Sequence, residues 1–467
     1  MKALSEEKKE IFEKFLKEII EKDKAKGIAV KAFYKTGEII YEKYFGNREE
    51  QNHLEIDQNT IFGIASITKS FVALSILQLV QEGKISLEDP ISKHIKYFTN
   101  KNNPNSILIK HLLTHTPGFF PMKRFTVDEI IQKLKVEDTL EKDLIYNEEF
   151  IEESLKTVSY ELDKETQFIG RPGEYFSYCN DGYGILSEII HKITGIPFAK
   201  YIEEKILIPL SMKRTNCSYI KNISDENCSM LYTLSKDKWT NDKNFKNRAF
   251  CLHGAGSIKS TINDLTKYIL LFLNEGKIKE KKILERYYIK EMMKPRIDFN
   301  HNLYYCYGLE LSEIDNRRYI NHPGSLPGVS SSIAFCPEEQ LGIVILCNTM
   351  DVSVNLLSRA LFNLIIGRNE LIENPKLPRI IWTKDNIEDI QGEYISKEDQ
   401  EDNFSIIQKE DKLYFIRKEK EREVIPVFEN EALVKGDKKY NFLFLIKNEE
   451  NKILGIRYGT RVLKKVV

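Results

Sequence analysis

Hydrophobic and polar positions follow different spacings along the chain, and each spacing predicts one type of element. Apolar residues recur at helical spacing among charged neighbours through 11–20, which predicts an amphipathic helix. Residues 28–34 and 39–45 are strand-like runs on either side of a polar turn, which predicts a β-hairpin. Later in the chain the same reasoning predicts strands at 319–320, 329–335 and 341–346 and a helix at about 352–366.

The run at 71–80 differs from these because it is apolar nearly all round, and it ends at Gly83. A helix of this kind is one that protein surrounds on every side. The region of about 65–300 is mainly helical in pattern. It includes a predicted helix at 185–194, which stops at Gly195.

The character of the chain changes after Gly367. Residues 371–386 include a proline-containing polar stretch, which predicts a linker. Residues 387–467 contain eight short strand-like runs at close spacing, which predict a small antiparallel β-barrel. The predicted strands are 392–395, 404–407, 413–416, 423–427, 432–434, 440–445, 453–456 and 462–463. We therefore expect one domain at 1–370 and a second at 387–467.

Composition narrows the class of protein. The chain has 467 residues, 42% hydrophobic and 30% charged, which is ordinary for a globular protein of two domains. Its formal net charge is zero, so no overall field favours nucleic acid. No apolar run is long enough for a secretion signal or a membrane span, and the seven cysteines are scattered. We expect a cytoplasmic protein that binds neither nucleic acid nor membrane.

Ser66 and Lys69 stand three residues apart where the buried helix begins. Residues at this spacing share a helix face, so the lysine amine can reach the serine hydroxyl. A serine needs a proton acceptor to act as a nucleophile, and the pKa of lysine responds readily to burial. The pair alone is weak evidence, because Ser235 and Lys238 match the same spacing in a stretch that reads as solvated. Its weight depends on whether matching motifs occur later in the chain.

Tyr178 and Asn180 lie in a turn-rich stretch that precedes the predicted helix at 185–194. Two residues apart on an extended backbone, both side chains face the same way. The tyrosine could transfer a proton, and the asparagine could bind a substrate amide or hold the lysine. The alternative is an ordinary packed aromatic beside an asparagine that caps the helix.

A third motif comprises His322, Pro323, Gly324 and Ser325, between two predicted strands. A glycine in such a strand lets a substrate backbone approach closely, and backbone N–H groups there can stabilise an oxyanion. A lone histidine is more often structural, but its place in a segment rich in proline and glycine favours a functional role.

In this order the three motifs resemble those of the serine hydrolases of the class C β-lactamase, DD-peptidase and esterase superfamily: S-x-x-K, Y-x-N, then K/H-x-G. Residues 112–118 and 253–265 resemble two further segments of that superfamily. The resemblance covers residues 27–367. It implies an α/β (α+β) fold in which both ends of this region form one antiparallel sheet flanked by helices, beside a helical subdomain.

The resemblance also implies roles for the candidate residues. Ser66 would be the nucleophile, and Lys69 and Tyr178 would share its proton. Substrate-binding roles fall to Asn180, His322, Gly324 and Ser325. The residues do not decide whether Lys69 or Tyr178 is the general base.

Two departures from the pattern bear on the substrate. Position 322 is histidine rather than the lysine of class C β-lactamases, and Pro323 offers neither a backbone N–H nor a hydroxyl. We therefore expect a peptidase or amidase for a small substrate, with a preference for D-residues as one option. A carboxylesterase is the nearest alternative. A β-lactamase or a non-catalytic binding module, similar to penicillin-binding proteins, ranks after it.

The C-terminal barrel resembles the lipocalin-like domain that some members carry. A ligand in the barrel is one option, but a core filled for packing or for contacts between copies of the chain is favoured. Every motif falls before Gly367, so we expect the catalytic groups in residues 1–370. We expect no cofactor and no metal. His111 and His115 lack the glutamate of a zinc motif, and the glycines at 254 and 256 lack the context of a nucleotide site.

Overall fold

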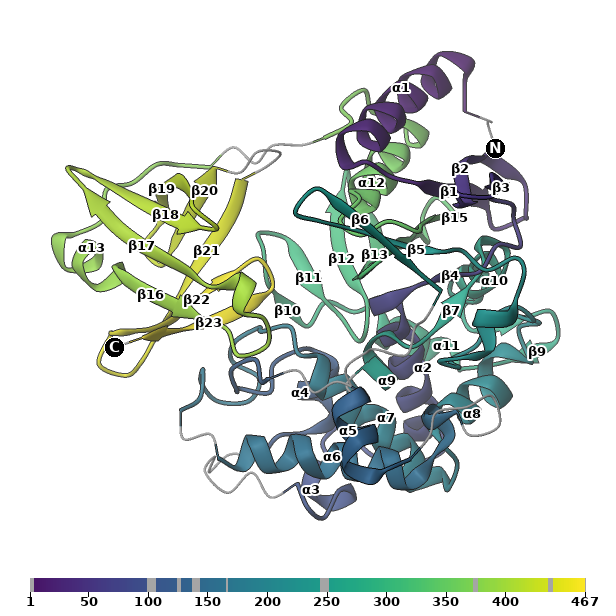
Figure 1. Ribbon diagram of the computed structural model, residues 1–467, viewed down its shortest axis with the longest axis horizontal. Helices are drawn as coiled ribbons and strands as arrows, with labels where there is room; N and C mark the ends of the chain where they lie inside the picture. The colour runs from purple at the N-terminus through teal and green to yellow at the C-terminus, as the bar shows by residue number, and fades with distance from the viewer. Residues whose placement is uncertain are drawn as a thin grey trace. The chain divides into compact units, whose positions relative to one another are not determined.

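A computed structural model describes residues 4–98, 106–123, 127–136, 143–164, 167–243, 252–372, 377–435 and 440–466 (Figure 1). The chain divides into two compact units, each built from several segments. The first unit comprises Met1–Leu87, Thr126–Leu155 and Tyr183–Glu373, and the second comprises Glu88–Phe125, Lys156–Gly182 and Asn374–Val467. The domain boundaries expected from the sequence stay predictions.

A nine-stranded sheet is the centre of the first unit, and each pair of neighbouring strands in it is antiparallel. The predicted N-terminal hairpin joins the later strands, because β1 pairs with β15 from Ile28 opposite Cys347 to Tyr34 opposite Leu341. The predicted α/β fold with a flanked antiparallel sheet is thereby confirmed. In sheet order the strands are β10 (Ile297–Asp298), β11 (Leu303–Tyr305), β12 (Glu310–Ile314), β13 (Arg317–Leu326), β14 (Val329–Cys336), β15 (Leu341–Cys347), β1 (Gly27–Tyr34), β2 (Ile39–Glu49) and β3 (Leu54–Glu55).

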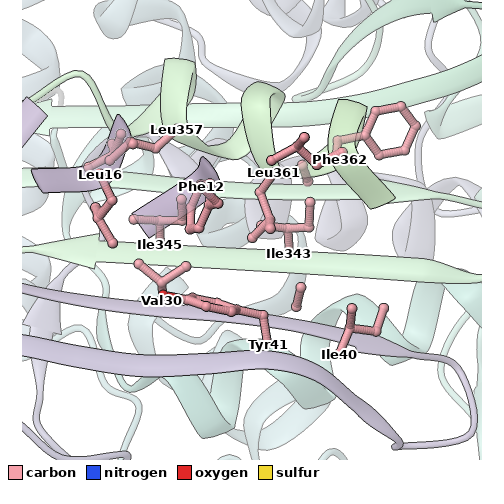
Figure 2. Close-up of a cluster of buried hydrophobic side chains, with 14 of the residues drawn as sticks. Phe12, Leu16, Val30, Ile40, Tyr41, Ile343, Ile345, Leu357, Leu361 and Phe362 are labelled. Carbon is pink, nitrogen blue, oxygen red and sulfur yellow. The ribbon is translucent and has the colours of Figure 1, made fainter. Parts of the chain in front are cut away.

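One face of this sheet is covered by α1 (Glu6–Asp23) and α12 (Val354–Ile365) (Figure 1). Since side chains alternate along a strand, every second residue of β1 and β15 faces these helices. Figure 2 shows Phe12 and Leu16 of α1 and Leu361 of α12 packed over Val30 and Ile345 of the strands. All five are fully buried.

The opposite face is covered by α10 (Ile262–Leu273), which in turn packs on α2 (Thr68–Gln81). Phe272 of α10 stacks on Phe335 of β14 with 5.0 Å between ring centroids, and Tyr268 stacks on Phe71 of α2 at 3.8 Å. The central strands are therefore buried on both faces, which explains why β1, β14 and β15 contain no exposed residue.

The remaining elements complete the helical region, with short two-stranded sheets among them. The other helices are α3 (Ile91–His94), α4 (Ile109–Leu113), α5 (Val127–Leu134), α6 (Glu148–Asp163), α7 (Asn180–Thr194), α8 (Phe198–Ile202), α9 (Leu252–Gly256) and α11 (Arg286–Met292). The two-residue strands β4 (Phe62–Gly63) and β7 (Lys259–Ser260) pair, as do β5 (Leu231–Ser235) with β6 (Lys238–Asp242) and β8 (Lys277–Ile278) with β9 (Lys281–Lys282).

A closed eight-stranded antiparallel barrel forms the C-terminal part of the second unit, which confirms the predicted barrel. Its interior holds an apolar cluster with aromatic residues such as Tyr394, Phe404 and Phe415. The strands are β16 (Gly392–Ile395), β17 (Phe404–Lys409), β18 (Lys412–Arg417), β19 (Lys420–Phe428), β20 (Glu431–Lys435), β21 (Tyr440–Lys447), β22 (Ile453–Tyr458) and β23 (Arg461–Val466).

A further helix, α13 (Lys384–Ile390), begins inside the predicted linker. The Thr383 hydroxyl caps this helix by accepting a hydrogen bond from the Asn386 N–H, and Ile390 is buried in the barrel core. Part of the predicted linker, 373–376, lies outside the described residues.

Candidate active site

Ser66 lies at the one partly exposed position of residues 61–79, all the others being buried. It is the middle residue of the single-turn helix η1 (Ala65–Ile67), which leads directly into α2. The preceding residue, Ala65, has a φ of +45°, in the left-handed region that side chains other than glycine avoid. Such a conformation costs about 1–3 kcal/mol and persists only where the surroundings impose it.

Strands β13 and β14 hold this turn in place. The Ser331 hydroxyl donates a hydrogen bond to the Ile64 carbonyl oxygen at 2.8 Å. A Cβ atom at Gly324 would lie 2.3 Å from the same oxygen and 3.2 Å from the Cβ atom of Ala65. Only glycine therefore allows β13 to pack this closely against the turn that presents Ser66. This packing role is distinct from the predicted substrate-binding role of Gly324, which stays a prediction.

Lys69 lies one turn beyond Ser66 and is fully buried. Its Nζ atom is 3.1 Å from Ser66 Oγ and donates a second hydrogen bond to the Ala255 carbonyl oxygen at 2.8 Å. It also lies 5.6 Å from the ring centroid of Tyr183. The geometry allows a proton to pass between the hydroxyl and the amine.

The carbonyl of Ala255 was not among the predicted site residues. It belongs to α9, whose Gly254 packs so tightly on α7 that a Cβ atom there would lie 2.1 Å from the Tyr183 carbonyl oxygen. The resemblance of residues 253–265 to a family segment was the only signal in the sequence for this contact.

The end of β13 is an open strand edge. β12 pairs with β13 only as far as Asn321, and β14 pairs with it as far as Leu326. Within the described parts of the chain, no strand pairs with the other edge of residues 322–326. An extended substrate could add there as a further strand. Ser325 is exposed, and Pro323 is partly exposed on the same segment.

His322 faces inward instead. Its Nδ1 atom is 2.7 Å from the Pro323 carbonyl oxygen, which can only accept, so Nδ1 carries the proton. Nε2 then accepts a hydrogen bond from the Tyr305 hydroxyl at 3.1 Å. Burial, together with the positive charge of Lys69, lowers the pKa of His322 to about 3. His322 is therefore a neutral group near pH 7, and no sequence pattern pointed to its partner Tyr305.

The two remaining predicted site residues, Tyr178 and Asn180, belong to the second unit. Tyr178 is 9% exposed, and its ring lies on that of His115 with 4.0 Å between centroids. His115 is itself fixed, because its Nδ1 atom accepts a hydrogen bond from the Cys179 N–H at 2.9 Å. Asn180 Nδ2 donates a hydrogen bond to Glu398 Oε1, also in the second unit, at 2.9 Å.

The helix after this motif begins earlier than predicted. Asn180 is the first residue of α7, five residues before the predicted start at 185. The Cys179 Sγ atom accepts a hydrogen bond from the Gly182 N–H at 3.2 Å, which satisfies a free N–H of the first turn. The glycines at 182 and 184 hid this turn in the sequence, since glycine disfavours helix. Tyr178 precedes the helix in an irregular segment, as expected.

The structure thus brings Ser66 and Lys69 together, with Gly324 behind the Ser66 turn and His322 buried on the same strand. Tyr178 and Asn180 are adjacent to one another and to residues of the barrel. Two of the latter, Glu398 in the segment after β16 and Arg461 at the start of β23, were not predicted, because an isolated charged residue carries no sequence signal.

The histidines that precede the Tyr178 motif make backbone contacts. His111 and His115 each use Nδ1 to accept a backbone N–H, from Leu108 and Cys179 respectively. Across the described ranges, no three His, Cys, Asp or Glu residues are grouped so that they could hold a metal ion. None of the helices in the described part of the chain is both long and apolar enough to cross a membrane.

The turn that carries Ser66 lies at the start of a buried helix beside an antiparallel sheet, and the comparisons place this fold in a family. The Beta-lactamase family model matches residues 12–365, so the chain belongs to this family. The predicted membership of the serine β-lactamase-like superfamily is confirmed. The superfamily is generally hydrolytic, although some of its members are not catalysts.

Individual relatives agree with this assignment. The chain is similar to Protein flp of Staphylococcus aureus (strain N315), with 29% identity over 337 residues that cover 71% of this chain and 62% of that protein. It therefore spans less than two thirds of that relative. It is also similar to the octameric penicillin-binding protein homologue from Pyrococcus abyssi, at 25% identity and a TM-score of 0.67, over 97% of this chain and 99% of that one. SurE, solved with D-Leu, shares the fold at a TM-score of 0.71, with 14% identity over 99% of this chain and 100% of that one.

The buried, neutral state of His322 predicts how acid affects stability. Between pH 6.5 and pH 3 the unfolded chain binds a proton at this histidine that the folded chain does not, so the free energy of unfolding falls as the pH falls. One such proton accounts for at most about 1.4 kcal/mol per pH unit. His322→Gln should lose less free energy of unfolding than the wild type between pH 7 and pH 4.5, measured by urea denaturation. Equal losses in both proteins would contradict the assignment.

Proposed function

We propose that the protein is a serine hydrolase that cleaves peptide or amide bonds through a covalent acyl-enzyme. The observation that carries this proposal is the pairing of a partly exposed Ser66 with the buried amine of Lys69 at 3.1 Å. An apolar residue would fill this buried position at a lower cost in free energy than a lysine does. Packing alone therefore does not explain why a lysine is buried here. Membership of a generally hydrolytic family supports the same conclusion.

In the proposed reaction, Ser66 Oγ forms a bond to the substrate carbonyl carbon while its proton passes to Lys69 or Tyr178. The resulting oxyanion accepts hydrogen bonds from the N–H groups of Ser66 and Ser325, each worth about 3 kcal/mol in the transition state. The carbon–nitrogen bond then breaks, and the amine leaves with a proton from Lys69 or Tyr178. Water attacks the acyl-enzyme, releases the acid and restores Ser66.

Substrate binding is assigned to the open edge of β13 and to Asn180. Gly324 and Ser325 would contribute backbone groups to substrate binding along this edge, and Asn180 would bind the substrate amide. His322, neutral and hydrogen-bonded to Tyr305, would shape the site rather than supply charge.

Three alternatives remain, and a carboxylesterase ranks first among them. A carboxylesterase would use the same nucleophile on an easier bond. A β-lactamase is less favoured, because a neutral His322 and a proline at 323 provide neither fixed positive charge nor hydroxyl for the carboxylate of the antibiotic. A non-catalytic binding module has no need for Ser66 beside Lys69.

The first prediction concerns the nucleophile. Ser66→Ala should reduce turnover by several orders of magnitude and leave the fold unchanged, because the proposed acyl-enzyme forms on the Ser66 hydroxyl. Ser75→Ala is the matched control. It removes a buried hydroxyl from the same helix, one that bonds only within α2, to the Phe71 carbonyl. More than about a tenth of wild-type activity in Ser66→Ala would exclude Ser66 as the nucleophile.

A second prediction concerns the substrate. One preparation is assayed with nitrocefin, p-nitrophenyl acetate and p-nitroanilides of D- and L-amino acids. D-residues are included because SurE was solved with D-Leu. We expect measurable hydrolysis of anilides or the ester and negligible turnover of nitrocefin. Nitrocefin turnover of the order of hundreds per second, as in an efficient enzyme, would restore the β-lactamase assignment.

We also propose that copies of the chain associate through the C-terminal domain. The P. abyssi homologue is octameric, and Ile381 next to the barrel is 95% exposed, with Phe428 38% exposed in the same unit. Exposed apolar side chains of this kind mark contact surfaces when they cluster.

Light scattering should accordingly give a mass above that of one chain. Ile381→Asp should lower this mass, because a charge in an apolar contact is costly. Lys384→Ala, at an exposed position three residues away, is the control. A single-chain mass for the wild type would contradict the proposal.

A further inference from the structure

The barrel reaches the segment that carries Tyr178 and Asn180 through its last hairpin. The Tyr178 N–H donates a hydrogen bond to the Thr460 carbonyl oxygen at 2.7 Å, in the turn between β22 and β23. The Val462 N–H donates to the Ser177 hydroxyl at 3.2 Å. Both contacts lie within the second unit. They fix the backbone of the motif against the barrel, independently of the side chains of Tyr178 and Asn180.

A pair of charged side chains adds to this docking. Arg461 donates to both carboxylate oxygens of Glu398, from Nε to Oε2 at 2.5 Å and from Nη2 to Oε1 at 3.2 Å. The Glu398 side chain is only 7% exposed. A carboxylate so deeply buried is tolerated because the planar guanidinium satisfies it in a two-pronged arrangement.

The same pair contacts both functional side chains of the motif. Glu398 Oε1 accepts the hydrogen bond from Asn180 Nδ2 at 2.9 Å, which sets the orientation of that amide. The guanidinium of Arg461 lies 5.1 Å from the ring centroid of Tyr178, within the range of a cation–π contact. The ring of Tyr178 also meets that of His115.

We propose that Glu398 and Arg461 are positioning residues for the reaction: the barrel, through this ion pair, holds Asn180 and Tyr178 in their working orientation. The proposal rests on the proposed function, since it assigns both groups to the acyl-transfer site. It leaves the catalytic groups in residues 1–370, as expected, and adds positioning residues outside that range. The barrel then becomes part of the catalytic apparatus without touching the substrate.

The test uses the full-length protein, with an amino-acid p-nitroanilide for turnover and a fluorophosphonate for labelling of Ser66. Glu398→Ala should lower kcat about 10- to 100-fold, the range for loss of a hydrogen bond to a charged group, with KM within about threefold. Labelling of Ser66 should persist, because Ser66 and Lys69 are unchanged. Glu398→Gln, which keeps an oxygen for Asn180, should retain more activity than Glu398→Ala.

Asp389→Ala is the matched control. Asp389 is a partly buried carboxylate of the same unit that pairs with Lys465 on β23 but is not bonded to the motif. It should keep most of the activity. If Glu398→Ala fails to fold, Arg461→Gln tests the same idea. It removes the guanidinium that fixes the Glu398 carboxylate, so this carboxylate no longer holds Asn180 in one orientation.

The outcomes distinguish failure of the positioning role from failure of the proposed function. Wild-type activity in folded Glu398→Ala, an equal loss in Asp389→Ala, or a loss confined to KM would each overturn the positioning role and leave the hydrolase assignment intact. Failure of the wild type to be labelled or to turn over any substrate would overturn the proposed function, and the positioning role with it.

Discussion

The turn that carries Ser66 depends on one steric constraint, the close packing of β13 and β14 against it. Ala65 adopts a left-handed conformation that an alanine avoids, and the contacts of Gly324 and Ser331 with Ile64 hold it there. With the turn fixed in this way, Ser66 is the only residue of 61–79 that is not buried. The sheet exists in this form because helices cover both of its faces and fix the register of its central strands. The local strain at Ala65 is thus sustained by the packing of the whole first unit.

The elements that could be predicted are those whose pattern is strong and local. The N-terminal hairpin, the helix at 71–80 and all eight barrel strands correspond to runs of apolar residues broken by turns. β10 and β11 were not predicted because they are only two and three residues long, and their pairing comes from neighbouring strands rather than from their own sequence. The early start of α7 was hidden for a related reason: glycine disfavours helix locally, and the neighbour that a Cβ atom at Gly182 would meet, Leu112 Cδ2 at 3.3 Å, is distant in the sequence.

The contacts of the site also divide into those that the local sequence predicts and those that it does not. Ser66 and Lys69 are three residues apart, so helix geometry alone predicts their contact. The partners that orient the remaining groups lie far away in the sequence: Tyr305 for His322, Ala255 for Lys69, and Glu398 for Asn180. Nothing local distinguishes these three from other tyrosines, alanines or glutamates. Tertiary structure alone brings them into place, and the barrel pair of Glu398 and Arg461 is the clearest case.

The central claim is that Ser66 forms a covalent bond with its substrate, and mass spectrometry tests it most directly. The full-length protein is incubated with a fluorophosphonate, its intact mass is measured, and the modified peptide is then sequenced. We predict one added group per chain, located on Ser66. An adduct on another residue, or none at all on the folded protein, would contradict the assignment of Ser66 as the nucleophile.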